Sequence, residues 1–582
     1  MRTMWPNVFR SVGFLVYVIC SVAGSNQEQR TNSDVLVQFR EYRPLAMHVD
    51  WLQSQLAQRW KECAGNLSIG IGCQWKVRSR RNLAVPKFPT DFVALSVAET
   101  FVSSVLEQLA SQDVVKKVML EKTFTRTLKF ESEKWESGTD ASHQRSLNSR
   151  FGAEDLIKSG AGPFSAPEVW QKGVTGRGIR VAVFDTGLRG DSTLFELELE
   201  RTNWTDEDDE FDDLVGHGTF VAGLIAGIHP ECPGIAPHAQ IVVFRVFSGT
   251  QISYTSWFLD AFNYALYSDI DILNLSIGGP DFSDEPFVEK VNELSAAGII
   301  IVSAIGNDGP VLGSLNNPAD MMDVIGVGGV DFHGGMANFS SRGMTTHELG
   351  YPFLSYGRVK PDLVTYARSL FGPSHKGDHC TKLSGTSVAS PVVSGAIALM
   401  LSSIPTQYRR EISNVASIKR ALIDSCKRLN GASIFEQGAG LLDIPAAVEA
   451  MEIVASETFR SLSDTSSAMT HEQGHVYRKP EGPPVALFPS FLDLSEAGCP
   501  YMWPFCSQAL YYGGVPLTVN VTIMNPTGLK SRILWTRWIS NDPNEVVDVS
   551  LTPPARFWPW SCGLGVHFRV AKEVEREMVL YG

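Results

Sequence analysis

Three features are scarce in this chain of 582 residues, and each scarcity excludes a class of protein. Beyond the amino terminus, no stretch approaches the roughly 18 uninterrupted apolar residues of a membrane-spanning helix, so we expect the processed chain to be soluble. A basic excess is missing too: the net charge of -13 argues against a nucleic-acid binder, which usually carries a basic face. Finally, no two of the nine cysteines form a Cys-x-x-Cys pair, so the sequence does not predict structural zinc.

The composition is ordinary for a globular protein, with 44% hydrophobic and 19% charged residues. The chain is too long for a single core, and its length suggests about three or four domains. The acidic charge fits a protein that receives basic peptides, and it fits simple solubility equally well. Composition alone does not separate these two interpretations.

Residues 1–24 resemble a secretory signal peptide. Arginines supply a positive start, residues 12–20 an apolar core, and small residues follow. This core is too short to span a membrane. We therefore expect an oxidising compartment, in which Cys499 and Cys506 are close enough in sequence to staple a loop.

Residues 25–130 alternate short apolar runs with helical patterns in the order β-α-β-β-α-β. This is the order of the ferredoxin-like fold. The expected strands and helices, in chain order, cover residues 35–39, 45–60, 73–77, 91–97, about 98–112 and 115–120. Residues 131–150 are polar, and we expect them to form a linker accessible to proteolysis.

Residues 151–455 alternate buried strands with helices, which predicts an α/β domain whose parallel sheet is covered by helices on both faces. Functional groups of such a sheet gather at the carboxyl ends of its strands. The expected strands are 179–184, 240–246, 270–275, 298–304 and 324–328, and the expected helices include 255–267 and 285–297.

The remaining residues divide into two regions. Residues 456–484 are rich in Ser, Thr, His and Pro, which favours a linker. Residues 485–582 are expected to form a β-rich appendage with strands at 516–524, 532–539 and 566–570.

Three segments carry side chains typical of nucleophilic catalysis. A buried strand, RVAVFDTG, ends near Asp185, and His217 opens a helix of small residues in GHGTFVAG. Ser387 lies in SGTSVASP at the start of an apolar helix, where unpaired backbone N–H groups favour developing negative charge. An acid, a base and a serine in this order can form a triad in which Asp185 orients His217 and His217 deprotonates Ser387.

These segments, with their flanking glycines, resemble those of the subtilisin-like serine proteases. The oxyanion asparagine of that family matches Asn307 in AIGNDGP, although asparagine in such a sequence can also be a simple turn former. Further segments, among them 244–247 and 253–264, resemble one branch of the family, the site-1 proteases. The resemblance is dense over residues 169–442 and thinner around 499–506.

The resemblance implies that residues 25–130 are an inhibitory propeptide. It also implies a substrate-binding strand whose glycines let a peptide backbone approach, although a strand followed by a turn would explain the same residues. The residues of this strand are Ser276, Gly278 and Gly279. Three nearby acids are alternative candidates for receiving a substrate arginine: Asp281, Asp284 and Glu285.

Two kinds of accessory site are also expected. Subtilisin relatives commonly carry structural calcium, so the resemblance implies Ca²⁺, and the acidic run at 206–213 could supply carboxylates, with a solvated loop as the alternative. Acceptor triplets predict glycans at Asn66, Asn203, Asn338 and Asn520. Asn274 also matches the triplet, but it falls in a strand that we expect to be buried.

Site-1 proteases favour an arginine four residues before the cut and an aliphatic residue two before it. The segments RTLK and RSLN fit this pattern, which predicts self-processing after Lys129 and after Asn148. Residues 81–84 fit it as well, inside a region that we expect to be folded. The paired arginines and leucines of the family's usual final site are missing, so the mature amino terminus stays open.

We therefore expect a self-processing serine endopeptidase of the secretory-pathway lumen, in the endoplasmic reticulum and Golgi. The resemblance implies that it cleaves lumenal segments of membrane-bound transcription factor precursors after Arg-x-(aliphatic)-x motifs, affecting sterol and stress responses. Its partners would be these substrates and its own propeptide. The family's membrane anchor is missing from this sequence, so we expect Gly582 to be a truncated end.

Two other functions are compatible with parts of the sequence. A convertase of soluble secreted precursors would need no membrane anchor. A catalytically silent binding protein would usually have lost a site residue, so the complete set of Asp185, His217, Ser387 and Asn307 argues against it.

Overall fold

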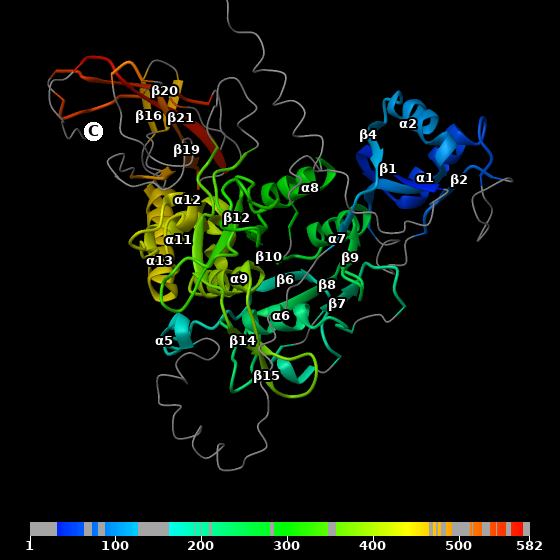
Figure 1. Cartoon of the computed structure of the whole chain (residues 1–582), viewed down its shortest axis with the longest axis horizontal. Helices are drawn as coiled ribbons and strands as arrows, with labels where there is room; N and C mark the ends of the chain where they lie inside the picture. The colour runs from blue at the N-terminus through cyan, green and yellow to red at the C-terminus, as the bar shows by residue number, and fades with distance from the viewer. Residues whose placement is uncertain are drawn as a thin grey trace, which may run out of the picture. The chain divides into compact units, whose positions relative to one another are not determined.

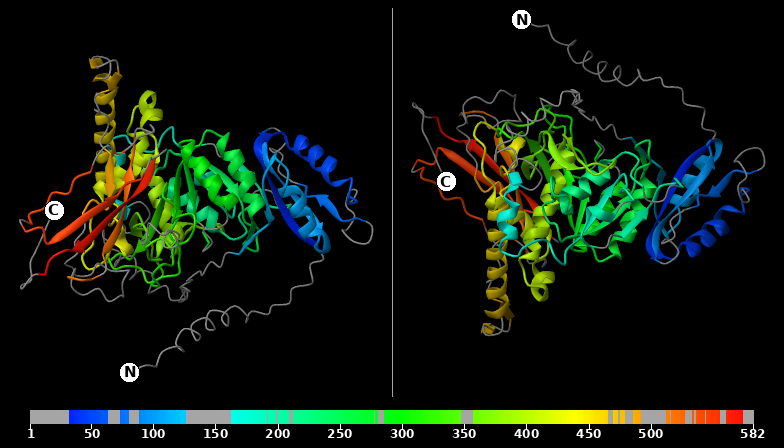
Figure 2. Two further views of the ribbon diagram at one scale, coloured as in Figure 1. Left: turned by 90° about the horizontal axis from the view of Figure 1, so that it is seen from above. Right: turned by 90° about the horizontal axis from the view of Figure 1, so that it is seen from below.

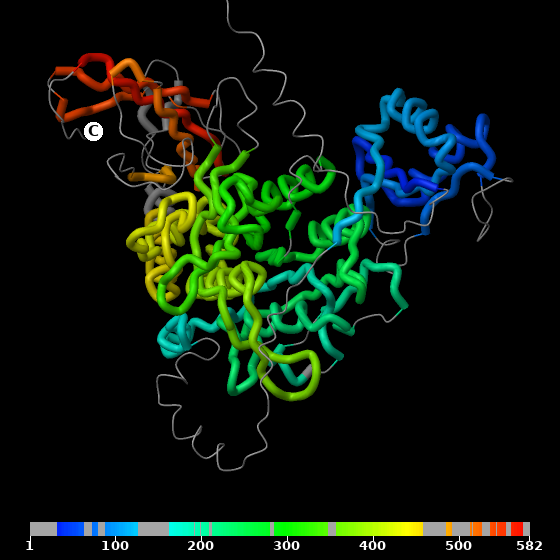
Figure 3. Tube along the Cα trace, in the orientation of Figure 1, coloured from blue at the N-terminus to red at the C-terminus, as the bar shows by residue number. Residues whose placement is uncertain are grey.

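The computed structural model divides the chain into two compact units, which are described separately (Figure 1). The first unit comprises Met1–Ser79 and Thr90–Glu121, and the second comprises Arg80–Pro89 and Lys122–Gly582. The structure, traced in Figure 3, describes residues 32–573 apart from the following: 63–72, 80–87, 126–161, 191, 198–199, 209–211, 277, 280–284, 347–356, 465–468, 473–474, 479–484, 492–511, 515, 527–532, 534–535, 543 and 555–559.

The first unit is a four-stranded antiparallel sheet with two helices. Its order along the sheet is β2-β3-β1-β4, which is the ferredoxin-like arrangement. Apolar residues of the strands, such as Val35 and Leu95, share one core with Leu52 and Leu109 of the helices. The predicted order of elements is confirmed, with these bounds: β1 Asn32–Arg43, α1 Leu45–Leu56, β2 Trp75–Val77, β3 Thr90–Ala98, α2 Val102–Ala110 and β4 Val115–Leu120.

The second unit is built on a seven-stranded sheet of order β13-β12-β11-β10-β6-β8-β7, in which every neighbouring pair is parallel. The five predicted strands are confirmed, and two short ones, β7 and β13, were not predicted. The bounds are β6 Arg180–Asp185, β7 Glu200–Asn203, β8 Gln240–Arg245, β10 Ile272–Leu275, β11 Ile300–Ala304, β12 Val324–Val330 and β13 Leu363–Tyr366.

Helices cover both faces of this sheet, as predicted. Successive strand residues point to opposite faces. Val181 and Val183 therefore share a core with α6 and α9 on one face, while Phe184 stacks on Phe262 of α7 on the other. The main helices are α5 Ala166–Trp170, α6 His217–Ala226, α7 Thr255–Leu266, α8 Glu285–Ala296, α9 Thr386–Ser402, α10 Thr406–Ile412, α11 Val415–Ser425, α12 Ile434–Gln437 and α13 Ile444–Asp464.

A second sheet, antiparallel and of order β18-β19-β21-β20, forms the predicted β-rich region (Figure 2). It is attached to the protease part by polar contacts: Trp560 Nε1 donates to the Ser295 carbonyl at 2.8 Å, and Asn414 Nδ2 donates to the Pro526 carbonyl at 3.1 Å. Its strands are β18 Ala486–Phe488, β19 Leu517–Met524, β20 Val547–Thr552 and β21 Ser561–Val570.

Two predictions for the carboxyl-terminal third are wrong. The described residues within 532–539 form no strand. The expected linker at 456–484 is partly structured instead, because α13 continues to Asp464 and β16 (Met469–Glu472) pairs with β17 (His475–Arg478). Ser, Thr and His are common in linkers, but they do not prevent a helix from continuing or a hairpin from pairing.

Two further pairs of strands and a disulfide lie in the described part of the second unit. β14 (Leu370–Pro373) pairs with β15 (Cys380–Leu383), and β5 (Thr123–Thr125) pairs with β9 (Ile252–Tyr254). A disulfide joins Cys232, in the loop after α6, to Cys380 at the start of β15. The expected staple between Cys499 and Cys506 lies outside the described residues. Within the described part of the chain, no helix has both the length and the apolar character needed to cross a bilayer.

Candidate active site

Asp185 is the last residue of β6 and is fully buried, at 0% exposure. It lies at the carboxyl edge of the parallel sheet, where the sequence predicted functional groups to gather. The Thr186 backbone N–H donates to Asp185 Oδ1 at 2.8 Å, so the carboxylate is held at the point where the chain leaves the strand.

His217 is the first residue of α6 and is buried. Its Nδ1 lies 2.8 and 2.9 Å from the two carboxylate oxygens of Asp185. The approach is possible because Gly218 has no side chain: a Cβ there would lie 2.2 Å from the Gly187 carbonyl oxygen. The carboxylate therefore fixes which imidazole nitrogen faces away from it.

Ser387 is the second residue of α9, and its Oγ lies 3.1 Å from His217 Nε2. The turn before it depends on Gly385, whose φ of +146° is one that L side chains rarely adopt. Its position places the Ser387 oxygen among the unpaired N–H groups at the start of a 17-residue helix. The structure thus brings Asp185, His217 and Ser387 into one continuous hydrogen-bonded chain.

Asn307 lies in the loop after β11 and is anchored through its side-chain oxygen. Asn307 Oδ1 accepts from the Thr386 backbone N–H at 2.9 Å and from Thr386 Oγ1 at 3.1 Å. Because the oxygen is taken, the Nδ2 group of the same amide is left to donate elsewhere beside the nucleophile. Thr386, which orients this amide, is not among the residues predicted from the sequence.

The three residues of the candidate substrate strand, Ser276, Gly278 and Gly279, make contacts within the protein. The Ser276 hydroxyl is buried and bonds to Asn274 and Ser390, so it packs the sheet against α9. The Gly279 N–H and carbonyl both pair with Asn317, at 3.1 and 2.7 Å. Gly278 is needed for close packing, since a Cβ there would lie 2.9 Å from Asn316 Cβ.

A peptide segment already lies beside Gly279, where a Cβ would lie 4.0 Å from the Phe124 ring. In β5 Phe124 is opposite Ser253 of β9, and the Thr255 N–H donates to the Lys122 carbonyl at 3.1 Å. The Phe124 ring lies 6.0 Å from Phe258 and 6.4 Å from Phe287. β9 therefore offers a sheet edge on which an extended chain pairs.

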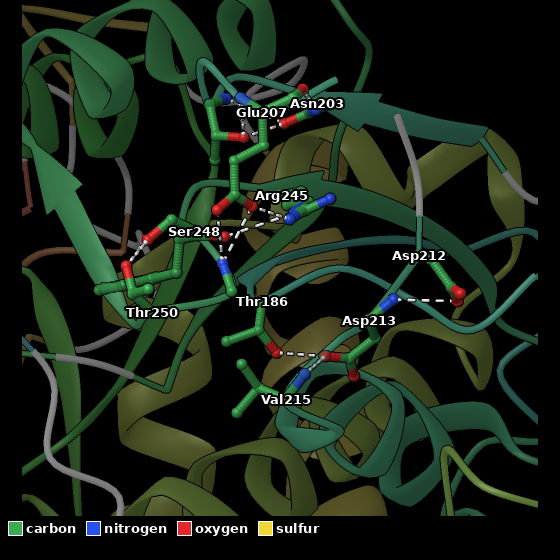
Figure 4. A network of polar contacts seen from close by, with 12 residues as sticks. Thr186, Asn203, Glu207, Asp212, Asp213, Val215, Arg245, Ser248 and Thr250 are labelled. Carbon is green, nitrogen blue, oxygen red and sulfur yellow. Dashed lines mark hydrogen bonds and ion pairs between the residues drawn. The ribbon is translucent and has the colours of Figure 1, made fainter. Parts of the chain in front are cut away.

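Two described carboxylates of the acidic run before His217, those of Glu207 and Asp213, are bound to protein donors. Glu207 directs its carboxylate at Arg245 and at the Gly249 N–H, which it accepts at 2.9 and 3.0 Å (Figure 4). Asp213 accepts hydrogen bonds from Thr186, Gly216 and Thr219 of the same chain. Because both carboxylates bind N–H or O–H groups, they are not arranged as oxygen ligands around a cation.

One other group of candidate metal ligands exists among the described residues: His229, Cys232 and Cys380. The two sulfur atoms are bonded to each other, so neither can act as the thiolate that binds zinc. His229 Nδ1 instead lies 3.2 Å from Cys380 Sγ.

The predicted glycan acceptors differ in accessibility. Asn338 is exposed, and Asn203 is half-buried with its Nδ2 donating to the Glu207 carbonyl at 3.1 Å. Asn520 is 3% exposed within β19, which leaves no room for a glycan, so that prediction is wrong for the folded chain. Asn66, the cut positions Lys129 and Asn148, and the acids Asp281 and Asp284 lie outside the described residues.

Comparisons with known proteins agree with this geometry. Residues 176–440 match the Subtilase family, and residues 488–578 match the third Ig-like domain of MBTPS1. The chain is 33% identical over 296 residues to the major intracellular serine protease of Bacillus subtilis, covering 47% of this chain and 86% of that relative.

Two longer matches extend over most of the chain. It is 44% identical over 528 residues to membrane-bound transcription factor site-1 protease of Homo sapiens, covering 86% of this chain and 46% of the relative. It is 40% identical over 579 residues to subtilisin-like protease SBT6.1 of Arabidopsis thaliana, covering 95% of this chain and 51% of the relative. The chain thus spans about half the length of these two relatives. With a subtilase segment on a seven-stranded parallel sheet and a similarity to subtilases along most of its length, the chain belongs to the subtilase family of serine endopeptidases.

Proposed function

We propose that Ser387 is the nucleophile of this endopeptidase, with His217 as its base and Asp185 as the orienting acid. The observation that carries the proposal is the position of His217, whose two ring nitrogens face Asp185 and Ser387 at 2.8 and 3.1 Å. In that arrangement His217 Nε2 accepts the Ser387 proton as Oγ attacks the peptide carbonyl, and returns it to the leaving amine. The buried Asp185 carboxylate stabilises the imidazolium that forms between these steps.

Asn307 would stabilise the oxyanion of the tetrahedral intermediate. Its Oδ1 is fixed by Thr386, the residue next to the nucleophile, so its Nδ2 is oriented before the substrate arrives. Preorganised donors of this kind cost no rearrangement during the reaction. Water then hydrolyses the acyl-enzyme by the same steps in reverse.

The substrates would bind as extended chains on β9. The pairing of β5 with β9 supports this, because the segment that pairs there continues directly into the RTLK sequence ending at Lys129. We infer that residues 25–130 act as a propeptide, that its end occupies the substrate edge, and that cuts follow Lys129 and Asn148. Ser276, Gly278 and Gly279 would hold the backbone near β5 in place by close packing.

The similarity to site-1 proteases supports a finer proposal for substrate and location. The chain would act in the lumen of the endoplasmic reticulum and Golgi on membrane-bound transcription factor precursors, cutting after Arg-x-(aliphatic)-x motifs. A convertase acting on soluble precursors would use the same site, and the two differ only in whether the substrate is membrane-anchored.

Secretion of the parent chain and of Ser387→Ala from the same cells, followed by sequencing of the product amino termini, tests the catalytic assignment. We expect cuts after Lys129 or Asn148 in the parent and none in the variant. Ser456→Ala is a matched control, because Ser456 is an exposed hydroxyl on α13 remote in sequence from the site motifs. Identical cuts in the parent and Ser387→Ala would mean that another protease trims the chain.

A further inference from the structure

Asp213 is a buried carboxylate with an unusual number of donors around it, shown in part in Figure 4. Its Oδ1 accepts from Thr186 Oγ1 at 2.7 Å, from the Gly216 N–H at 2.7 Å and from the Val215 N–H at 3.2 Å. Its Oδ2 accepts from both the N–H and the hydroxyl of Thr219, each at 2.7 Å. A carboxylate with two oxygens and about four lone-pair sites is the side chain suited to such a set of donors.

The donors come from both halves of the candidate triad. Thr186 directly follows Asp185, and its own N–H donates to Asp185 Oδ1 at 2.8 Å. Gly216 and Thr219 flank His217 in the first turn of α6. The Thr186 hydroxyl closes the link by accepting the Gly218 N–H at 2.9 Å. One carboxylate therefore ties the end of the acid's strand to the start of the base's helix.

We propose that Asp213 is a positioning residue that fixes the separation and orientation of Asp185 and His217. The inference rests on the proposed catalytic roles of those two residues. Asp213 touches neither the imidazole nor the Asp185 carboxylate through any of these five bonds, so its effect passes through Thr186 and the first turn of α6. An error of about 1 Å in such a pair can cost about 100-fold in rate.

An amide cannot replace this carboxylate without loss. All five contacts of Asp213 are donors, whereas asparagine presents one oxygen and one NH₂ group. In Asp213→Asn the NH₂ group replaces one carboxylate oxygen and then faces N–H or O–H donors. Depending on how the amide is turned, the hydrogen bonds lost are either those from Thr219 or those from Thr186 and Gly216. The acid and the base would then move relative to each other while the substrate edge on β9 keeps its structure.

The test measures kcat and KM per active site, with the active fraction counted by labelling Ser387 with a fluorophosphonate. The probe is a coumarin amide of residues 122–129, cut at Lys129. We expect Asp213→Asn to lower kcat at least tenfold with KM changed less than twofold. Asp212→Asn is the matched control: it makes the same charge change one residue away at an exposed position, and we expect kcat within twofold of the parent.

A second pair of variants keeps the inference testable if Asp213→Asn does not fold. Thr186→Val removes the hydroxyl that joins Asp213 to the strand, whereas Thr186→Ser keeps it. We expect Thr186→Val to lower kcat and Thr186→Ser to restore it. The double variant Asp213→Asn with Thr186→Val should lose less than the product of the two single losses, because both break the same link.

The outcomes separate this inference from the proposed function. If the parent leaves the peptide uncut, or if Ser387→Ala cuts it, the catalytic assignment fails. If the parent cuts the peptide, Ser387→Ala does not, and kcat per site is the same in Asp213→Asn and Asp212→Asn, the positioning role alone is refuted. Equal kcat values for Thr186→Val and Thr186→Ser would refute it in the same way.

Discussion

Replacing Asp362 by asparagine should destabilise the second unit strongly and in a pH-dependent way. Asp362 is a buried carboxylate shared by two buried lysines: it accepts from Lys360 Nζ at 2.6 Å and from Lys419 Nζ at 3.0 Å. It also accepts the Gly326 N–H at 2.7 Å, which fixes β12 to the segment leading into β13. Burial alone would raise the pKa of Asp362, but Lys360 and Lys419 together hold it below its ordinary value.

The magnitude follows from the charges that the substitution leaves behind. Burial lowers the pKa of Lys360 to about 7 although Asp362 attracts its charge, so removing that carboxylate further favours the neutral form of Lys360. In the variant Lys419 Nζ keeps its bond to the Met322 carbonyl at 2.7 Å but loses the carboxylate at 3.0 Å, and a buried ammonium without a counter-charge is expected to release its proton. Keeping a lysine of ordinary pKa neutral costs about 4 kcal/mol at pH 7.5 and about 1.2 kcal/mol at pH 9.5.

The sign of the pH dependence is set by the folded state of the variant. Without the Asp362 carboxylate, burial favours the neutral form of Lys419 in the folded variant, so the unfolded chain binds more protons than the folded one. Stability therefore rises with pH between pH 7.5 and pH 9.5. The free-energy difference between the parent and Asp362→Asn should shrink by about 2–3 kcal/mol between pH 7.5 and pH 9.5.

Urea unfolding followed by tryptophan fluorescence at the two pH values is the assay. Asp548→Asn is the control, since Asp548 pairs with Arg569 at 3.0 Å with both side chains more than half exposed. Such a pair contributes about 0–1 kcal/mol. A loss below about 1 kcal/mol in Asp362→Asn at pH 7.5, or a loss that does not shrink at pH 9.5, would refute the reasoning.

Two further predictions concern the site and its surface. Asn307→Ala should lower kcat by about 10²–10³-fold with little change in KM, which is the size of the effect for the same donor in subtilisin, the reference case. Steady-state kinetics on a fluorogenic peptide measure this change, and an unchanged kcat would mean that Asn307 is a turn former only. Asn338→Gln should remove one glycosidase-sensitive step in gel mobility, because Asn338 is exposed. Asn520→Gln should leave the mobility unchanged, because Asn520 is buried in β19, and a mobility change in this variant would contradict the burial argument.

The sequence predicted the parallel sheet because its strands are buried on both faces. Mostly apolar residues make up five of its strands: β6, β8, β10, β11 and β12. Strands that are buried on both faces need apolar residues on both, so they can be predicted from such runs. β7 is only four residues long and consists of Glu, Arg, Thr and Asn, so nothing in its pattern distinguishes it from a loop. Its strand conformation is imposed by pairing with β8.

The three catalytic candidates were predictable for a different reason. Each lies near a glycine that no other residue could easily replace. Gly218 leaves no room for a Cβ against the Gly187 carbonyl, and Gly385 before Ser387 has a φ that L side chains rarely adopt. The residues that hold these groups in place were not predictable. Asp213 lies within an acidic run that resembles a solvated loop or a cation site, and its real partners, Thr186 and Thr219, become its neighbours only when the strand and the helix come together.

The distance along the chain between the proposed base and the proposed nucleophile also bears on how the protein is made. His217 and Ser387 are 170 residues apart, although their side chains meet in the folded protein. At a synthesis rate of about 5–20 residues per second, the ribosome needs on the order of 10–30 s to extend the chain from one to the other. Throughout that interval the nascent chain lacks the proposed nucleophile and cannot use it to cleave itself or its neighbours. The residues of the ferredoxin-like unit have been synthesised before any of the three is, so this unit can fold before the complete triad exists.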